Sequence, residues 1–90
     1  MTVYDPDLVS DDPRIHRLDY ALRIVGDEVL RALDRFESFN SPHEGYAVIL
    51  EELDELWEQV KANRGREPDA INEAKQIAAM AVRYMIEAGR

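Results

Sequence analysis

The chain of 90 residues contains no cysteine and only four glycines, four prolines and two phenylalanines. Without cysteine it has no disulfide framework, no thiolate metal site and no cysteine nucleophile, and a reducing cytoplasm is the expected location. So few turn-forming residues argue against a sandwich or barrel, because such folds need many turns. A hydrophobic share of 46% with 33% charged residues is typical of a globular chain, so we expect one all-α domain.

The chain also lacks long apolar runs and an excess of basic residues. No apolar stretch reaches about 18 residues, and the N-terminus has neither the basic start nor the apolar segment of a signal peptide. The net charge of −8 repels a polyanion over most of the surface. We therefore expect no membrane partner and no nucleic-acid partner. Small phosphorylated ligands remain compatible with this charge, because a divalent cation bridges carboxylates to phosphate oxygens.

The pattern predicts a mostly irregular N-terminal arm, residues 1–12, and a single helical domain, residues 13–90. Pro13 suits the first turn of a helix, where its missing N–H costs no hydrogen bond. Apolar residues at helical spacing continue this helix to about residue 38. Its stripe consists of Ile15, Leu18, Leu22, Val25, Val29, Ala32, Leu33 and Phe36. Three large apolar residues lie off the stripe and suggest a second surface to be covered: Tyr20, Ile24 and Leu30.

Two more helices are predicted beyond the break "FNSPHEGY". Ser41 and Glu44 have the spacing of a capping box and start a helix that ends near Ala62. Its stripe is Tyr46, Ile49, Leu50, Leu53, Leu56, Trp57 and Val60. The last helix spans about residues 68–88, and its expected buried side is Ile71, Ala74, Ile77, Ala78, Ala81, Val82 and Met85. Three such helices bury a thin core, so we expect a four-helix-type bundle completed by a second chain.

The stretch "ILEELDELW" places four carboxylates in five positions. At about 100° per residue, Glu51 and Asp54 fall on the side away from the apolar stripe. Glu52 flanks the stripe, with Glu55 one turn further on, where a bundle-core metal site draws its ligands. The alternative is an ordinary solvated surface, since Glu favours helices without any metal.

The last helix carries a polar edge opposite its alanine-rich side, made of Glu73, Gln76, Met80 and Arg83. If the second and third helices pack antiparallel through the short turn between them, both polar edges converge on one cleft. Glu52, Glu55 and Glu73 would then supply the protein ligands of a hard cation such as Mg²⁺.

Two segments, "HEGYAVILEELDELWEQVK" and "EAKQIAAMAVRYMIE", resemble the MazG-like all-α nucleoside triphosphate pyrophosphohydrolases over about residues 43–87. That family carries E-x-x-E on one helix and E-x-x-D on the next. The resemblance implies a Mg²⁺ cofactor, with Mn²⁺ as a substitute, and a nucleoside triphosphate substrate cleaved to monophosphate and pyrophosphate. It also implies four-helix modules assembled as a homodimer or homotetramer.

Carried over by position, the resemblance implies that Glu52, Glu55, Glu73 and Gln76 hold the metal. Glu55 would be the catalytic residue that orients or deprotonates the attacking water. Gln76 stands where the family has Asp and removes one negative charge from the site. The resemblance therefore leaves open whether the chain is active, is a nucleotide-binding relative without turnover, or is a helical interaction protein.

Three further residues are candidates for binding substrate. Arg83 stands where many relatives have Asn, and its planar fork suits a phosphate, although it could equally pair with Glu73 or Glu87. Lys61 lies where a triphosphate tail would reach the turn after the second helix. Trp57 is a candidate for base stacking, with core or subunit interface as the alternative.

Overall fold

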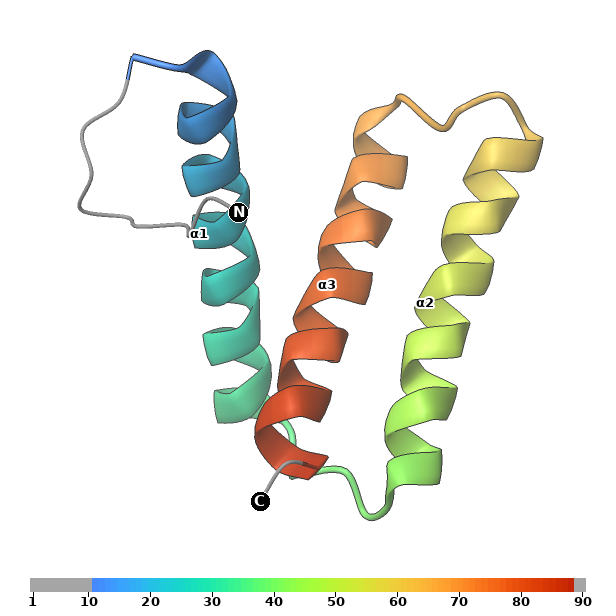
Figure 1. Cartoon of the computed structure of the whole chain (residues 1–90). Helices are drawn as coiled ribbons and strands as arrows, with labels where there is room; N and C mark the ends of the chain where they lie inside the picture. The colour runs from blue at the N-terminus through green and yellow to red at the C-terminus, as the bar shows by residue number, and fades with distance from the viewer. Residues whose placement is uncertain (1–10, 89–90) are drawn as a thin grey trace.

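The computed structural model describes residues 11–88, which form three α-helices (Figure 1). These are α1, Pro13–Arg35, α2, Pro42–Lys61, and α3, Pro68–Ala88. No strand occurs within residues 11–88, which confirms the all-α prediction. The helix bounds agree with those expected, except that α1 ends at Arg35 rather than near residue 38. Most of the predicted arm, residues 1–10, lies outside the described residues.

Side-chain caps fix where the first two helices begin. Asp12 Oδ1 accepts a hydrogen bond of 2.9 Å from the backbone N–H of Arg14, so the last residue of the predicted arm is the N-cap of α1. Ser41 Oγ accepts one of 3.1 Å from the N–H of Glu44, as the capping-box pattern predicts. The Glu44 carboxylate reaches back one residue beyond the usual partner, to the backbone N–H and side-chain amide of Asn40.

The three helices form a single layer with α3 in the middle (Figure 1). Both α1 and α2 pack on α3, and within the described range they make no close backbone approach to each other. The Cα radius of gyration is 14.9 Å, against about 12 Å for a compact domain of this length. The arrangement is therefore flat and leaves both faces of the layer open.

The hydrophobic core is small because a single layer has no opposite layer to close it. Four buried residues form it, Val29 and Ala32 from α1 and Ala79 and Met80 from α3. Half-buried apolar side chains surround it: Val25, Phe39, Val48, Ile49 and Val82. Most of the predicted stripes stay exposed, as expected for a chain that buries little surface by itself.

The predicted buried side of α3 is wrong in part, since Ile77, Ala78 and Val82 are half-buried but the other predicted residues are exposed. Ile71 and Met85 are 57% and 71% exposed, whereas Met80 and Arg83, which the pattern assigned to the polar edge, are buried. The physical reason is that α3 is covered from two directions. Its polar edge lies between α1 and α2, and Ile71, Ala74, Ala81 and Met85 of the predicted side are exposed.

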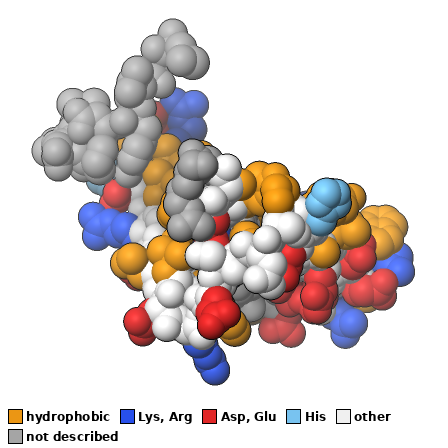
Figure 2. All heavy atoms as spheres, turned by 90° about the horizontal axis from the view of Figure 1, so that it is seen from below, with side chains coloured by type: hydrophobic (Ala, Val, Ile, Leu, Met, Phe, Trp, Pro, Cys, Tyr) orange, Lys and Arg blue, Asp and Glu red, His pale blue; other side chains and the backbone are white. Residues whose placement is uncertain are grey.

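Large apolar side chains remain exposed along α2 and α3, and we call seven of them the outer face. Its members are Tyr46, Leu50, Leu53, Trp57 and Val60 of α2 and Ile71 and Met85 of α3. Figure 2 shows hydrophobic side chains at the surface on the α2 side of the molecule, with acidic side chains gathered below them. Tyr20 and Leu30, off the predicted stripe of α1, are also exposed. None of the described helices is long and apolar enough to cross a membrane.

Gly45 is the one buried residue of α2. A Cβ atom there would lie 2.8 Å from Cδ2 of Tyr84 and 3.1 Å from Cδ2 of Phe39. The missing side chain therefore lets the Tyr84 ring of α3 lie directly against the α2 backbone.

Gly45→Ala is expected to destabilise the fold by about 1–3 kcal/mol, because an aromatic ring must move away from the added methyl group. Gly26→Ala is the matched control, since nothing lies within 4 Å of its Cβ position. It should stabilise the protein by up to about 1 kcal/mol through helix propensity alone. Urea unfolding of both variants measures the difference, and equal effects at the two positions would contradict the close Gly45–Tyr84 packing.

Candidate metal centre

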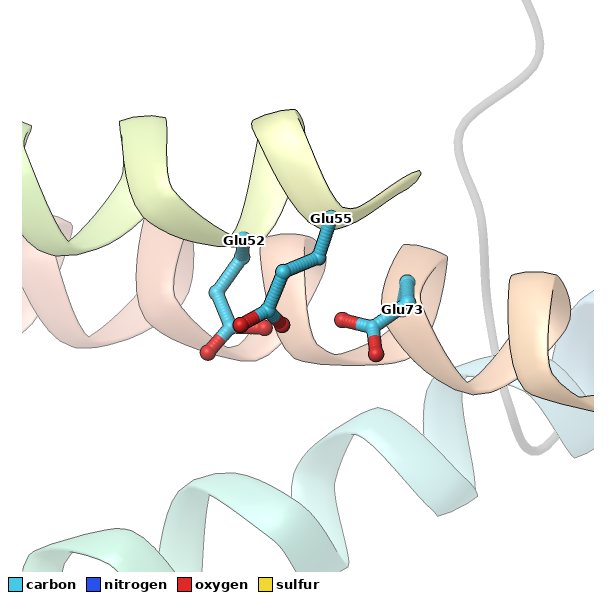
Figure 3. Close-up of side chains that lie close together, drawn as sticks. All are labelled: Glu52, Glu55 and Glu73. Atoms are coloured by element: carbon cyan, nitrogen blue, oxygen red, sulfur yellow. The ribbon is translucent and has the colours of Figure 1, made fainter. Parts of the chain in front are cut away.

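Three carboxylates from two helices converge at the α2–α3 interface. Glu52 and Glu55 lie one turn apart on α2, and Glu73 lies on α3. Each offers one carboxylate oxygen, and these oxygens all lie within 4.8 Å of one another. Figure 3 shows the Glu52 and Glu55 carboxylates side by side, with Glu73 reaching toward them from α3. We call this group the Glu triad.

The turn between α2 and α3 brings the triad together. Asn63 adopts a left-handed backbone with φ of 59°, a conformation that Asn tolerates better than most residues. The N–H of Arg64 then donates to the carbonyl of Gln59 over 2.9 Å, which closes the end of α2. The chain reverses within a few residues, so α3 runs back antiparallel beside α2 (Figure 1).

The triad concentrates like charge in a partly desolvated place. Burial, together with the neighbouring carboxyls of Glu73 and Glu55, raises the pKa of Glu52 from 4.5 to about 7. Burial also raises the pKa of Glu73, and the nearby charge of Glu55 acts in the same direction. Carboxylates held this way favour either a shared proton or a shared cation.

One atom of the triad indicates a cation more directly. Glu73 Oε2 is buried, and when all three carboxyls are ionised it accepts no hydrogen bond from any described residue. Oxygens on one Mg²⁺ ion, each at about 2.1 Å, lie about 3–4 Å apart, so small side-chain rotations would bring the triad to that spacing. All three donors are carboxylate oxygens, the ligand type that hard cations prefer. The residues present could therefore hold a hard divalent cation.

Gln76, the predicted fourth ligand, is half-buried one turn beyond Glu73 on α3 and is directed toward α1. Its amide lies near the carboxylate of Glu28, whose pKa is held below the ordinary value chiefly by Arg31 and secondarily by Gln76. Arg31 Nη2 contacts both Glu28 oxygens, at 2.7 and 2.6 Å. Sequence reasoning missed Glu28, because its place depends on how α1 docks on α3 and no spacing within α1 reveals that.

A cleft of about 520 Å³ lies along α3 between α1 and α2, and Glu52 is the member of the triad that lines it. Glu52 and Gln76 line one end of it, and residues 36–40, the connection between α1 and α2, line the other. The cleft lies on the side of α2 that carries Glu44 and Val48, opposite the outer face at helical spacing.

Arg83 lines the cleft but is only 4% exposed. Its Nε donates to Glu87 over 3.0 Å, its Nη2 donates to the carbonyl of Glu37 over 3.1 Å, and its guanidinium lies 4.3 Å from the centre of the Phe39 ring. Of the alternatives offered by the sequence, the pairing with Glu87 is present. Arg83 thereby holds the connection between α1 and α2 against α3.

Trp57 and Lys61 do not line this cleft. Trp57 belongs to the outer face and is 55% exposed. Lys61 forms an ion pair of 2.7 Å with Glu58, and its Nζ lies 5.9 Å from the centre of the Trp57 ring. The structure thus brings together Glu52, Glu55 and Glu73. Of the predicted site residues, Glu52, Gln76 and Arg83 line the cleft, whereas Trp57 and Lys61 lie on another surface.

Comparisons with protein-family models, with curated proteins and with solved structures gave no match to the chain.

Metal-free protein is expected to lose stability as the pH rises from about 4.5 to about 7. Folded Glu52 keeps a proton through this range, whereas the unfolded chain releases it, so the stabilising effect is complete below about pH 4.5 and is lost as Glu52 ionises. The pKa values of Glu28 and Glu44 are lowered, so these two groups change the stability with pH only below about pH 4.5. Thermal unfolding in EDTA at about pH 5 and about pH 7.5 measures the effect.

Mg²⁺ should restore the stability lost at the higher pH, because it binds the ionised triad of the folded state. Glu52→Gln should flatten both the pH dependence and the Mg²⁺ effect. An unfolding temperature of the wild type that rises across this window in EDTA would contradict the assignment.

Proposed function

We propose that the protein is a Mg²⁺-dependent nucleoside triphosphate pyrophosphohydrolase, which cleaves its substrate to nucleoside monophosphate and pyrophosphate. The observation that carries the proposal is the Glu triad, which includes a buried oxygen of Glu73 without a hydrogen-bond donor among the described residues. The adjoining cleft supports it, since 520 Å³ lies within the range of about 300–1,000 Å³ of small-ligand sites. The resemblance in sequence to the MazG-like enzymes agrees with this chemistry.

In this proposal each triad residue has a distinct task. Glu52 and Glu73, the more buried pair, hold the cation between α2 and α3. When bound, Mg²⁺ neutralises charge on the phosphoryl oxygens and on the departing pyrophosphate. Glu55 is the exposed member and can contact water, so it orients the water and accepts its proton. The oxygen of that water bonds to phosphorus as the anhydride bond to pyrophosphate breaks.

A second candidate is a nucleotide-binding or protein-interaction relative without turnover. The observation that favours it is the direction of Gln76, which lies toward Glu28 and adds no negative charge to the triad. A site with three carboxylates binds its cation less tightly than one with four. This candidate keeps the fold and the metal position but loses activation of the water.

Glu55→Gln is expected to lower pyrophosphate release at least about 100-fold, because an amide cannot accept the proton of the water. Release is measured over a panel of canonical and modified nucleoside triphosphates with Mg²⁺ or Mn²⁺. Glu51→Gln is the matched control, since Glu51 is exposed on the same helix outside the triad. Equal activity in both variants would contradict the role of Glu55.

Gln76→Asp separates the two candidates. If wild-type protein releases no pyrophosphate from any nucleotide but this variant does, the chain is the inactive relative. If neither variant nor wild type is active, and metal with nucleotide causes no thermal shift, both nucleotide-based functions are excluded.

We further propose that a second copy of the chain covers the outer face and completes a four-helix bundle as a homodimer, from which a homotetramer could be built. The exposed parts of the seven side chains of the outer face amount to roughly 700 Å². This area is close to the about 800 Å² that each partner buries in a standard interface. On α2 these residues are spaced by four and three, the spacing of helices that pack side by side.

Leu53→Glu should convert a dimer to monomer, because it places a charge at the centre of the outer face. Tyr20→Glu is the control: Tyr20 is 67% exposed and lies about 180° around α1 from buried Val29, away from the outer face. Sedimentation equilibrium measures the mass of each. Wild-type protein that stays monomeric at about 100 μM, well above typical dimer dissociation constants, would contradict the proposal.

A further inference from the structure

We propose that Arg35, supported by Arg31, forms a phosphate subsite at the end of the cleft away from the Glu triad, where it takes the phosphate chain of a metal-bound polyphosphate. The inference rests on the proposed function, because the metal at the triad supplies the other end of the site. It assigns a role to residues of α1 that lie outside the triad and outside the region of sequence resemblance.

The placement of the two arginines carries the inference. Arg31 and Arg35 lie four residues apart, one turn on α1, and both line the cleft that contains Glu52. Arg31 engages Glu28 through a single nitrogen, Nη2. Arg35 is exposed, and its guanidinium has no ion pair or hydrogen-bond partner among residues 11–88. A planar guanidinium open to a cleft matches phosphate oxygens in bidentate fashion.

Arg35 fits this role better than the other basic residues near the site. Arg83 lines the same cleft, but it is buried and its nitrogens already contact Glu87 and Glu37. Lys61 lies outside the cleft and pairs with Glu58. In a chain of net charge −8, an uncompensated arginine in the cleft that Glu52 lines is the group that would attract an anion.

Charge balance adds a condition to the binding. Four glutamates line the cleft against three arginines: Glu28, Glu37, Glu44 and Glu52. Glu28 is neutralised by Arg31, whereas the ionised triad repels an incoming anion until a cation compensates it. A polyphosphate should therefore bind only with Mg²⁺ present, its metal-bound end at the triad and its other end at Arg35.

The test is calorimetric titration of the full chain with inorganic tripolyphosphate, in Mg²⁺ and in EDTA. Mg²⁺ alone is titrated separately. Arg35→Gln should weaken tripolyphosphate binding in Mg²⁺ about tenfold or more, as expected for the loss of a charge-assisted hydrogen bond, and leave the affinity for Mg²⁺ alone unchanged. Arg35→Lys should restore part of the loss. Arg66→Gln is the matched control, because Arg66 is an exposed arginine of the α2–α3 turn outside the cleft.

The readouts separate this inference from the proposed function. Arg35 also lies in the last turn of α1, where a positive charge stabilises the helix end. Loss of that structural role would change the thermal stability but not the affinity for tripolyphosphate. If Mg²⁺ binds and tripolyphosphate binds equally to wild type, Arg35→Gln and Arg66→Gln, the subsite is overturned while the metal site stands. If Mg²⁺ does not bind, the proposed function fails first. Tripolyphosphate binding that is equally tight in EDTA would overturn the metal-dependent form of the inference.

Discussion

The Glu triad and the residues of the adjoining cleft take their positions from the packing of α3 between α1 and α2. Because α3 is covered from two directions, its polar edge lies inside the layer and not in solvent. Glu73 thereby meets Glu52 and Glu55 of α2, and Gln76 meets Glu28 of α1. The cleft exists because the two flanking helices contact α3 but make no close approach to each other within the described residues.

A buried ion pair holds one end of this layer. Arg83 and Glu87 have side chains only 4% and 5% exposed, and Glu87 Oε1 also accepts the backbone N–H of Phe39 over 2.7 Å. Removing two charges from water is costly, so such a pair is tolerated only when further hydrogen bonds satisfy both groups. Here those bonds reach Glu37 and Phe39, which ties the connection after α1 to the last turn of α3.

The sequence predicted the ends of the helices well, but it predicted poorly which side of α3 is buried. Pro13, Ser41 and the Asn63 turn are local signals, and each marks a helix end in the structure. The buried side of α3 was mispredicted because this helix has apolar residues in several directions. Periodicity gives those directions but does not say which neighbour covers which one.

The residues of the candidate site also fall into those that a local sequence pattern identifies and those that depend on helix packing. Glu52 and Glu55 could be picked out because an i, i+3 pair beside an apolar stripe is a property of one helix. The position of Glu73 could be predicted from the short turn alone, because that turn makes α3 antiparallel to α2. The docking of α1 on α3 decides the positions of Glu28, Arg31 and Arg35 relative to the site. Because α1 and α3 are far apart in the chain, no local pattern marks these residues.

The packing of α2 on α3 forms the Glu triad, in which it brings together like charges that a cation would stabilise. The most direct measurement is the anomalous X-ray difference map of crystals grown with Mn²⁺. The account predicts one Mn²⁺ per chain within about 2.5 Å of a carboxylate oxygen of Glu52, Glu55 and Glu73. No ion at the triad, or an ion bound instead by the solvated acids Glu51, Asp54 and Glu58, would contradict it.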